Sequence, residues 1–367
     1  MKIGIITLSA SDNCGSLLQT YALKNILEKF GDVDVINFSS KESHDMYDVP
    51  RYKGLNRIRR RRKIKAMARA SKDYERFRKK YVGISGKEYL YEELSEISNS
   101  YDVVVAGSDQ VWNVQMRDFS EAFFLGWTDS KKVAYAPSLG GKHLNLSNNF
   151  EQIKKWLNEF SFLSVREEVG KLCLEEVTGR KIPKVLDPTL VLDEDEWNKL
   201  VGPPLIKDDY IFYYSWAYIE DSTSQIVSDA SKRSGLPVYV IDPRKWLDRN
   251  PEKWGFSLYK KSGPYIFLNL MKYSKICYVE SFHGMVFAYI FRRNFWLLDT
   301  HENMDDLDSR LMEFVNLLDA KDRILTEYNV DKVNQDKEVE YSANSLLNGL
   351  RKESWSYINQ AFNEGSL

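Results

Sequence analysis

Residues 280–291, ESFHGMVFAYIF, place a histidine at the start of an expected helix. The apolar run ICYV comes directly before them, and Ser281, His283 and Gly284 begin the helical pattern. Backbone N–H groups at a helix start attract anions, phosphate especially, and a glycine lets a ligand approach the backbone. An imidazole there can give or take a proton near neutral pH. A capping serine beside a structural histidine is the alternative, but the position after a strand favours a functional site.

A second candidate is Arg166 in the stretch SVREE, which continues the apolar run FLSV. A guanidinium at a strand end can hold a carboxylate or a phosphate through two parallel hydrogen bonds. The alternative is an ion pair with Glu167, Glu168 or a neighbouring helix. We expect Arg166 to bind an anion.

A third candidate is the loop GSDQVWN, residues 107–113, which follows the apolar run VVVA. Asp109 can orient a hydroxyl group or act as a base, and Trp112 can stack on a sugar ring. A tight loop in which Asp109 caps the next helix is the alternative. The other candidates for substrate binding in this loop are Ser108, Gln110 and Asn113. In the later stretch LDPTL, by contrast, we interpret Asp187 as structural.

A fourth candidate is the stretch SASDNCGSLLQTYAL, residues 9–23, in which a polar loop leads into a helix. Its glycine serves either tight packing or a pocket that receives an anion. We expect Asn13 and Gly15 to line a cleft.

The elements that carry these loops alternate between apolar runs of strand length and helical patterns. Such alternation indicates parallel sheets with right-handed crossovers. In open parallel sheets, ligands bind at the carboxyl ends of the strands, and this rule selects the four loops.

The alternation occurs twice, as expected for a chain of 367 residues. The polar, proline-bearing stretch VLDEDEWNKLVGPPLIKDD, residues 191–209, separates the two sets and is interpreted as a linker. We therefore expect an N-terminal domain over 1–192 and a C-terminal domain over 205–335. A final helix is expected over 343–362, where it can pack back on the N-terminal domain.

The composition is typical of a soluble globular protein, with 43% apolar and 29% charged residues and a net charge of −1. It excludes a polyelectrolyte binder, and a nucleic-acid-binding function is remote. The cysteines are far apart and form no CxxC pair, which argues against a disulfide framework or a zinc site and fits a reducing compartment. Without a signal peptide or a long apolar run, we expect the cytoplasm.

Residues 51–82 are densely basic and interrupt the alternation. Tyr74, Phe77 and Tyr81 follow at helical spacing, so a helical insertion with a solvated basic face is one interpretation. The other is a patch for an anionic partner, either a membrane leaflet at Arg57–Lys65 or a lipid-diphosphate-linked substrate.

Five stretches in this order, NCGSLLQTYAL, AGSDQVWN, SVREE, LDPTLVL and ESFHGMVFAYIF, resemble the polysaccharide pyruvyl transferase family. The resemblance runs from Ile3 to Leu318. It implies a fold like the GT-B glycosyltransferases, in which two Rossmann-like domains face a cleft. The N-terminal domain would lie on the acceptor side and the C-terminal domain on the donor side.

The resemblance also implies an activity without a cofactor or a metal. Phosphoenolpyruvate would be the donor, and a sugar of a surface polysaccharide or of its lipid-linked precursor would become a pyruvate ketal. His283 falls on the histidine of the family and Arg166 on its arginine. Ser281 departs from the pattern, because several members have an arginine there that would help to hold the donor; Arg292 and Arg293 are candidates to replace it.

Two other functions stay open at this stage. A GT-B glycosyltransferase with a nucleotide-sugar donor would share the fold and the phosphate site. A non-catalytic partner in polysaccharide assembly would keep only the fold.

Overall fold

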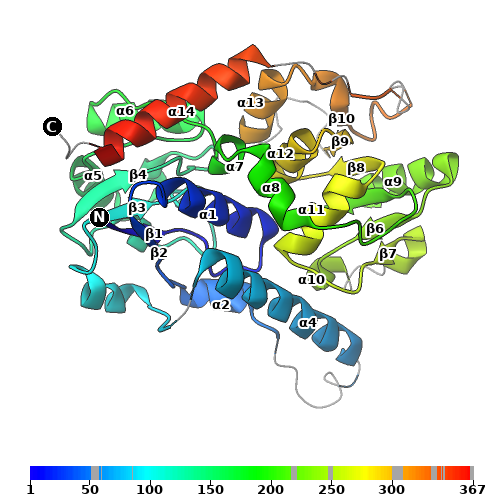
Figure 1. Ribbon diagram of the computed structural model, residues 1–367, viewed down its shortest axis with the longest axis horizontal. Coiled ribbons are helices and arrows are strands. Elements are labelled where there is room, and N and C mark those ends of the chain that lie inside the picture. Colours follow the sequence, from blue (N-terminus) through cyan, green and yellow to red (C-terminus); the bar gives the residue numbers. More distant parts are fainter. Residues whose placement is uncertain are drawn as a thin grey trace.

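The computed structural model describes the chain except residues 51–57, 59, 85, 216–220, 247–250, 300–308, 332–336, 340, 342–343 and 364–367. Its described strands form two parallel sheets that lie side by side, each flanked by helices (Figure 1). The structure thus has the α/β architecture that the alternation predicts.

The N-terminal sheet has four strands in the order β2-β1-β3-β4. They are β1 (Lys2–Ile6), β2 (Asp32–Val35), β3 (Val103–Ala106) and β4 (Lys131–Ala134). The apolar run FLSV, expected to be a strand, joins its neighbour only through a single bridge from Val133 to Phe162. The later stretch KVL, residues 184–186, joins its neighbour only through a bridge from Val165 to Lys184. Pro183 and Pro188 flank the second stretch, and proline has no N–H for a ladder.

Helices cover this sheet on both sides (Figure 1). The α-helices of this half are α1 (Cys14–Leu27), α2 (Lys41–Tyr47), α4 (Arg61–Phe77), α5 (Phe150–Asn158), α6 (Glu168–Thr178) and α7 (Pro188–Val191). A π-helical turn, η1 (Arg78–Val82), continues α4, and short 3-10 turns lie at η2 (Tyr91–Ile97), η3 (Glu121–Phe124) and η4 (Leu144–Leu146).

The C-terminal sheet has six strands in the order β10-β9-β8-β5-β6-β7. They are β5 (Ile211–Tyr214), β6 (Val238–Val240), β7 (Ser257–Leu258), β8 (Ile276–Val279), β9 (Asn294–Leu298) and β10 (Ile324–Leu325). The helices of this half are α9 (Asp221–Ser234), α10 (Pro243–Trp246), α11 (Pro264–Tyr273), α12 (Phe282–Ile290) and α13 (Ser309–Leu317), with 3-10 turns η5 (Pro251–Trp254) and η7 (Lys321–Arg323).

The stretch interpreted as a linker contains a helix, α8 (Glu194–Val201), that is part of the core. Its Trp197 is fully buried. The indole packs edge-on against Phe287 of α12, 4.9 Å between ring centroids, and lies 5.6 Å from Tyr21 of α1. The connection is therefore packed between the two halves and is not a solvent-exposed linker.

Two contacts cross between the halves near the start of α1. The carboxylate of Asp12, with 3% of its side chain exposed, pairs with Arg78 of η1 at 2.9 Å and with Arg244 of α10. In addition, α4 packs against α10 and α11.

The helix α14 (Ser345–Asn363) crosses back from the C-terminal half and lies on the N-terminal sheet (Figure 1). Tyr357 donates from its hydroxyl to the carbonyl of Ala134 at 2.8 Å, and the hydroxyl of Ser354 accepts from the N–H of Leu186 at 2.9 Å. The last helix of the described chain thus packs on the N-terminal half and hydrogen-bonds to its backbone.

Within the described part of the chain, each helix is too short or too polar to cross a membrane.

Candidate active site

The loops that end β1, β3 and β8 meet at a cavity of about 430 Å³ between the two halves. Loop residues and helix starts contribute most of its lining: Asn13, Gly15, Ser16, Asp109, Gln110, Arg117 and Asp118 from the N-terminal half, and Glu280, Ser281, His283 and Arg310 from the C-terminal half. The carboxyl ends of the strands therefore define one site, as the strand-end rule predicts.

The N-terminal turns of α1 and α12 face each other across this cavity. A methyl group on Gly15 would lie 2.3 Å from Nδ1 of His283, closer than van der Waals contact allows. A glycine is therefore required at position 15, because only a residue without Cβ lets the imidazole of His283 come this near. The turn is packed tightly and also lines the cavity, while the binding of an anion there stays a prediction.

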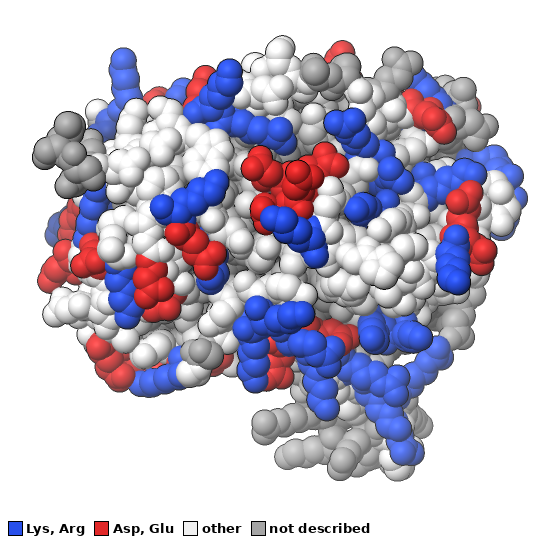
Figure 2. Space-filling view, in the orientation of Figure 1, with Lys and Arg blue, Asp and Glu red and all other residues white. Residues whose placement is uncertain are grey.

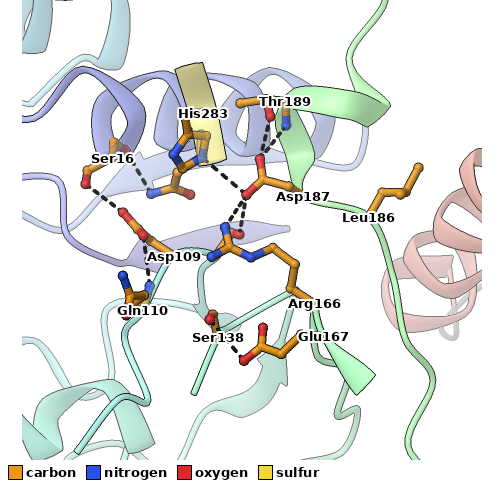
Figure 3. A network of polar contacts seen from close by, with 12 residues as sticks. Ser16, Asp109, Gln110, Ser138, Arg166, Glu167, Leu186, Asp187, Thr189 and His283 are labelled. Atoms are coloured by element: carbon orange, nitrogen blue, oxygen red, sulfur yellow. Dashed lines mark hydrogen bonds and ion pairs between the residues drawn. The ribbon is translucent and has the colours of Figure 1, made fainter. Parts of the chain in front are cut away.

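Asp187 lies at the centre of a buried polar network that links both halves (Figure 3). Its Oδ2 accepts from Nη1 of Arg166 at 2.6 Å and from the hydroxyl of Ser108 at 3.2 Å, and lies 3.4 Å from Nε2 of His283. Its Oδ1 accepts from the N–H and the hydroxyl of Thr189. One carboxylate thus fixes the catalytic candidate His283 and the anion-binding candidate Arg166 relative to each other.

The charge of this network is set by burial and by its cations. Burial alone would raise the pKa of Asp187, but His283 and Arg166 outweigh it, so the pKa lies well below its ordinary value. The ionised carboxylate lies 3.4 Å from Nε2 of His283 and keeps the ring oriented, as a carboxylate does for histidine in acyl-transfer triads. The arrangement suits a histidine that takes part in proton transfer.

Arg166 is buried, with 4% of its side chain exposed, and its ion-pair partner is Asp187. Its guanidinium lies 4.7 Å from the ring centroid of Phe282. It lines a second, more apolar cavity of about 420 Å³ on the far side of Phe282, not the cavity that holds His283. The expected anion partner is thus a carboxylate of the chain itself, although neither Glu167 nor Glu168.

The two helix starts are already capped by their own side chains. Oδ1 of Asn13 accepts from the N–H groups of Gly15 and Ser16, and Oγ of Ser281 accepts from the N–H of Gly284 at 3.0 Å. A methyl group on Gly284 would meet Ser281 and Val279 at about 3 Å, so tight packing fills the space beside its Cα. Gly284 is not among the residues that line the cavity, and its expected role in ligand binding stays a prediction.

The first amides of α12 stay open to an anion. The N–H groups of Phe282 and His283 form no hydrogen bond with any residue that the structure describes. Both belong to residues that line the cavity, and the helix dipole favours negative charge at this end.

The loop after β3 is tied down from the N-terminal side. Asp109 has a positive φ of 80°, which is unusual for a residue other than glycine. Its Oδ2 accepts from the hydroxyl of Ser16 at 2.6 Å and its Oδ1 accepts from the N–H of Gln110 at 2.9 Å. Asp109 therefore joins the loop to α1 and keeps its carboxylate at the cavity wall, while Ser108 acts on Asp187.

Two residues of this loop lie away from the cavity. Trp112 is fully buried, stacks on Phe124 at 5.3 Å and donates its N–H to the carbonyl of Phe123. It cannot stack on a sugar ring, and that prediction is wrong. Asn113 is 8% exposed and contacts the side chain of Gln110 at 2.8 Å, so it supports Gln110 and does not line the cavity.

The cations near the cavity differ from those expected to replace the family arginine at Ser281. Arg292 and Arg293 follow the far end of α12, so they lie about 13 Å along the helix from its start. Arg310 at the start of α13 and Arg117 line the cavity instead. When the side-chain amide of Gln110 is oriented with its oxygen toward Arg310, Nη1 and Nη2 of Arg310 donate to this oxygen at 2.9 and 3.1 Å.

The residues of this site that were missed from the sequence include Asp187, Arg310, Arg117 and Asp118. Asp118 is 2% exposed at the cavity wall, and burial raises its pKa above the ordinary value. A signal existed for Asp187, because it too follows a short apolar stretch at the same edge of the sheet. Arg310 has no such signal, because it lies within a helix far along the chain.

The fold is similar to that of two solved structures. The UDP-GlcNAc 2-epimerase from Methanocaldococcus jannaschii has 15% identity and a TM-score of 0.55, with 98% of this chain and 99% of that chain covered. The UDP-N-acetylglucosamine 2-epimerase from Rickettsia bellii has 10% identity and a TM-score of 0.53, with 99% and 97% covered. At such identities the likeness shows the fold alone, which is the expected GT-B-like one.

No curated protein sequence matches the chain. The sequence profile named polysaccharide pyruvyl transferase, however, matches residues 13–302. This range holds all five quoted stretches and most of the residues that line the cavity, although Arg310 lies beyond it. The chain belongs to the polysaccharide pyruvyl transferase family.

Proposed function

We propose that the protein transfers the pyruvyl group of phosphoenolpyruvate to two hydroxyl groups of a sugar, so that a cyclic ketal forms and phosphate leaves. The acceptor sugar belongs to a surface polysaccharide or its lipid-linked precursor. Membership of the family supports the transferase class. The observation that carries the proposal is the imidazole of His283, held by ionised Asp187 at the cavity between the halves.

The donor carries a phosphate and a carboxylate, and the cavity offers groups for both. The open N–H groups of Phe282 and His283 suit the phosphate, as does the positive end of the α12 dipole. Arg310 and Arg117 bring positive charge to the same cavity. Arg166 contributes indirectly in this proposal: it keeps Asp187 ionised and positioned.

The chemistry then needs one proton donor and one route for hydroxyl protons. Protonated His283 gives its proton to the methylene carbon, and the first acceptor hydroxyl attacks the cation that develops at C2. The same imidazole recovers the proton of that hydroxyl. The second hydroxyl then displaces phosphate from C2, which closes the ring, and its proton leaves with the phosphate. Asp109 at the opposite wall orients the acceptor hydroxyl groups.

A thermal-shift comparison tests the donor. Phosphoenolpyruvate should raise the unfolding temperature of the protein, and a panel of nucleotide sugars should not, because a ligand stabilises the state that it binds. Stabilisation by a nucleotide sugar alone would support a glycosyltransferase and contradict the proposal. Stabilisation by neither donor class would favour a non-catalytic role in polysaccharide assembly.

Phosphate release with a panel of soluble glycosides tests the reaction. His283→Ala and Arg166→Ala should each lower the rate at least about 100-fold. Lys154→Ala, on the exposed surface of α5, is the matched control and should leave the rate unchanged. Rates within about threefold of wild type in the two site variants would overturn these roles.

A further inference from the structure

The outer face of α4 presents a dense group of cations that the proposed reaction does not use. The inner face of this helix is buried through Met67, Ala70, Tyr74 and Phe77. The exposed cations of the helix are Arg61, Arg62, Lys65, Arg69, Lys72 and Arg76. The basic segment therefore forms an amphipathic helix, as expected, and its basic side faces solvent.

Acidic residues are few on α4 itself. The two acidic residues of α4 lie toward its end, where Asp73 pairs with Arg76 at 3.2 Å and Glu75 pairs with Lys79 at 2.6 Å. Lys65, Arg69 and Lys72 have no ion-pair partner in the part of the chain that is described. They recur at positions i, i+4 and i+7, so they share one side of the helix.

The packing of α4 adds cations from the other half of the chain. Oδ2 of Asp73 accepts from the N–H of Ser262 at 3.3 Å, and a methyl group on Gly263 would lie 3.4 Å from the backbone of Asp73. Lys260 and Lys261, both exposed, directly precede this contact. Figure 2 shows the basic side chains gathered over α4 at the lower edge of the molecule.

We propose that this composite basic surface, formed by Arg61, Arg62, Lys65, Arg69, Lys72, Lys260 and Lys261, docks the protein on an anionic membrane leaflet. Lipid headgroups attract clustered cations without any shaped pocket, over about one Debye length. Ile58, with 71% of its surface exposed just before α4, adds an apolar contact for the interface.

A nucleic acid fits this surface less well. Single strands are bound by stacking bases on exposed aromatic rings. The aromatic residues of α4, Tyr74 and Phe77, are buried at 2% and 3% exposure and cannot provide such a platform. Of the segment Arg57–Lys65 expected from the sequence, Arg57 and Arg59 lie outside the described residues, and the surface extends beyond it to Lys72 and into the C-terminal half.

Co-sedimentation with vesicles tests the proposal independently of any transferase activity. The full chain should bind vesicles that contain phosphatidylglycerol at least about tenfold more tightly than vesicles of phosphatidylcholine, and about 0.5 M salt should abolish the difference. The triple variant Lys65→Glu, Arg69→Glu, Lys72→Glu and the double variant Lys260→Glu, Lys261→Glu should each lose most of this binding.

A matched triple reversal of exposed lysines elsewhere, Lys154→Glu, Lys155→Glu, Lys181→Glu, should bind like wild type. The corresponding glutamine variants keep the test valid if the glutamate variants fail to fold. Equal binding by all variants would overturn the proposal. So would tighter binding to a single-stranded RNA than to the anionic vesicles, with loss in the same variants.

Discussion

Asp187 contacts the side chains of both Arg166 and His283, and its own hydrogen bonds explain why both side chains stay ordered. Its side chain is fully buried, and each of its oxygens accepts from a defined donor. A buried carboxylate without such partners would be neutral or absent. At the residue scale, the site is therefore a network in which Asp187 holds the side chains of Arg166 and His283 in fixed positions.

Replacing the carboxylate of Asp187 by an amide tests the role of this network. Asp187→Asn should lower kcat for phosphate release at least about 100-fold, because the neutral amide removes the carboxylate that orients the ring of His283. The milder variant Thr189→Val removes one hydrogen bond to Asp187 and should cost less than about tenfold. An unchanged kcat in Asp187→Asn would show that the carboxylate only supports the fold.

The same variant carries a pH signature in stability. The pKa of Asp187 is lower in the folded chain than in the unfolded chain. Its ionised form therefore contributes stability above about pH 4, and this contribution is lost as the pH falls through the folded pKa. The gap in free energy of unfolding between wild type and Asp187→Asn should shrink as the pH falls below about 4 in chemical denaturation. A gap that is constant with pH would contradict the charged state.

Gly15 gives a steric test at the opposite helix. Gly15→Ala places a methyl group 2.3 Å from Nδ1 of His283, so the imidazole must leave its position against Asp187. We expect at least about a tenfold loss of kcat and a lower unfolding temperature. Gly349→Ala in α14 is the control: no atom lies within 4 Å of its added methyl group, and it should stabilise the helix by up to about 1 kcal/mol. Equal behaviour of the two variants would show that His283 does not require the close approach.

At the element scale, α8 binds the two halves together where a linker was expected. The indole of Trp197 donates to the carbonyl of Thr189 at 3.2 Å, two residues after the aspartate of the site. Trp197→Ala should destabilise the protein by about 3–5 kcal/mol, since it empties a closed part of the core. Leu172→Ala on α6, where 58% of the leucine is exposed, should change stability by less than about 0.5 kcal/mol. Denaturant unfolding measures the free energy of unfolding of both variants. Similar losses of stability in the two would show that α8 does not contribute to the core between the halves.

The sequence predicted most elements and the edge of the sheet that holds the site, because apolar runs and helical spacing are local signals. It did not predict which side chains of a loop turn inward. Trp112 and Asp109 are three residues apart, yet one is in the core and the other lines the cavity. Asp187 looked like a turn residue, and it does accept from the N–H of Thr189, but its second oxygen meets partners from distant loops. Such pairing depends on tertiary contacts that no single stretch contains.

At the scale of the whole molecule, Asp12 limits how the halves can move. It holds Arg78 on one side and Arg244 on the other, beside the wall of the cavity. Asp12→Asn should cost up to about 3 kcal/mol of stability, because two partly buried arginines lose their buried counter-ion. Faster hydrogen exchange in η1 and α10 should accompany it. The exposed pair of Lys2 and Asp34 is the control, since Asp34→Asn should have almost no effect. Unchanged exchange in η1 and α10 would show that other contacts hold the halves.

The course of α14 also bears on how the protein is made. Ribosomes release the amino-terminal strands long before Ser345–Asn363 are synthesised, yet these late residues supply Ser354 and Tyr357 to the backbone around β4. The nascent first half must therefore wait with part of its apolar surface uncovered, a state in which chains attract chaperones or aggregate. A stop codon before Ser345 would consequently damage the half of the protein that was translated first.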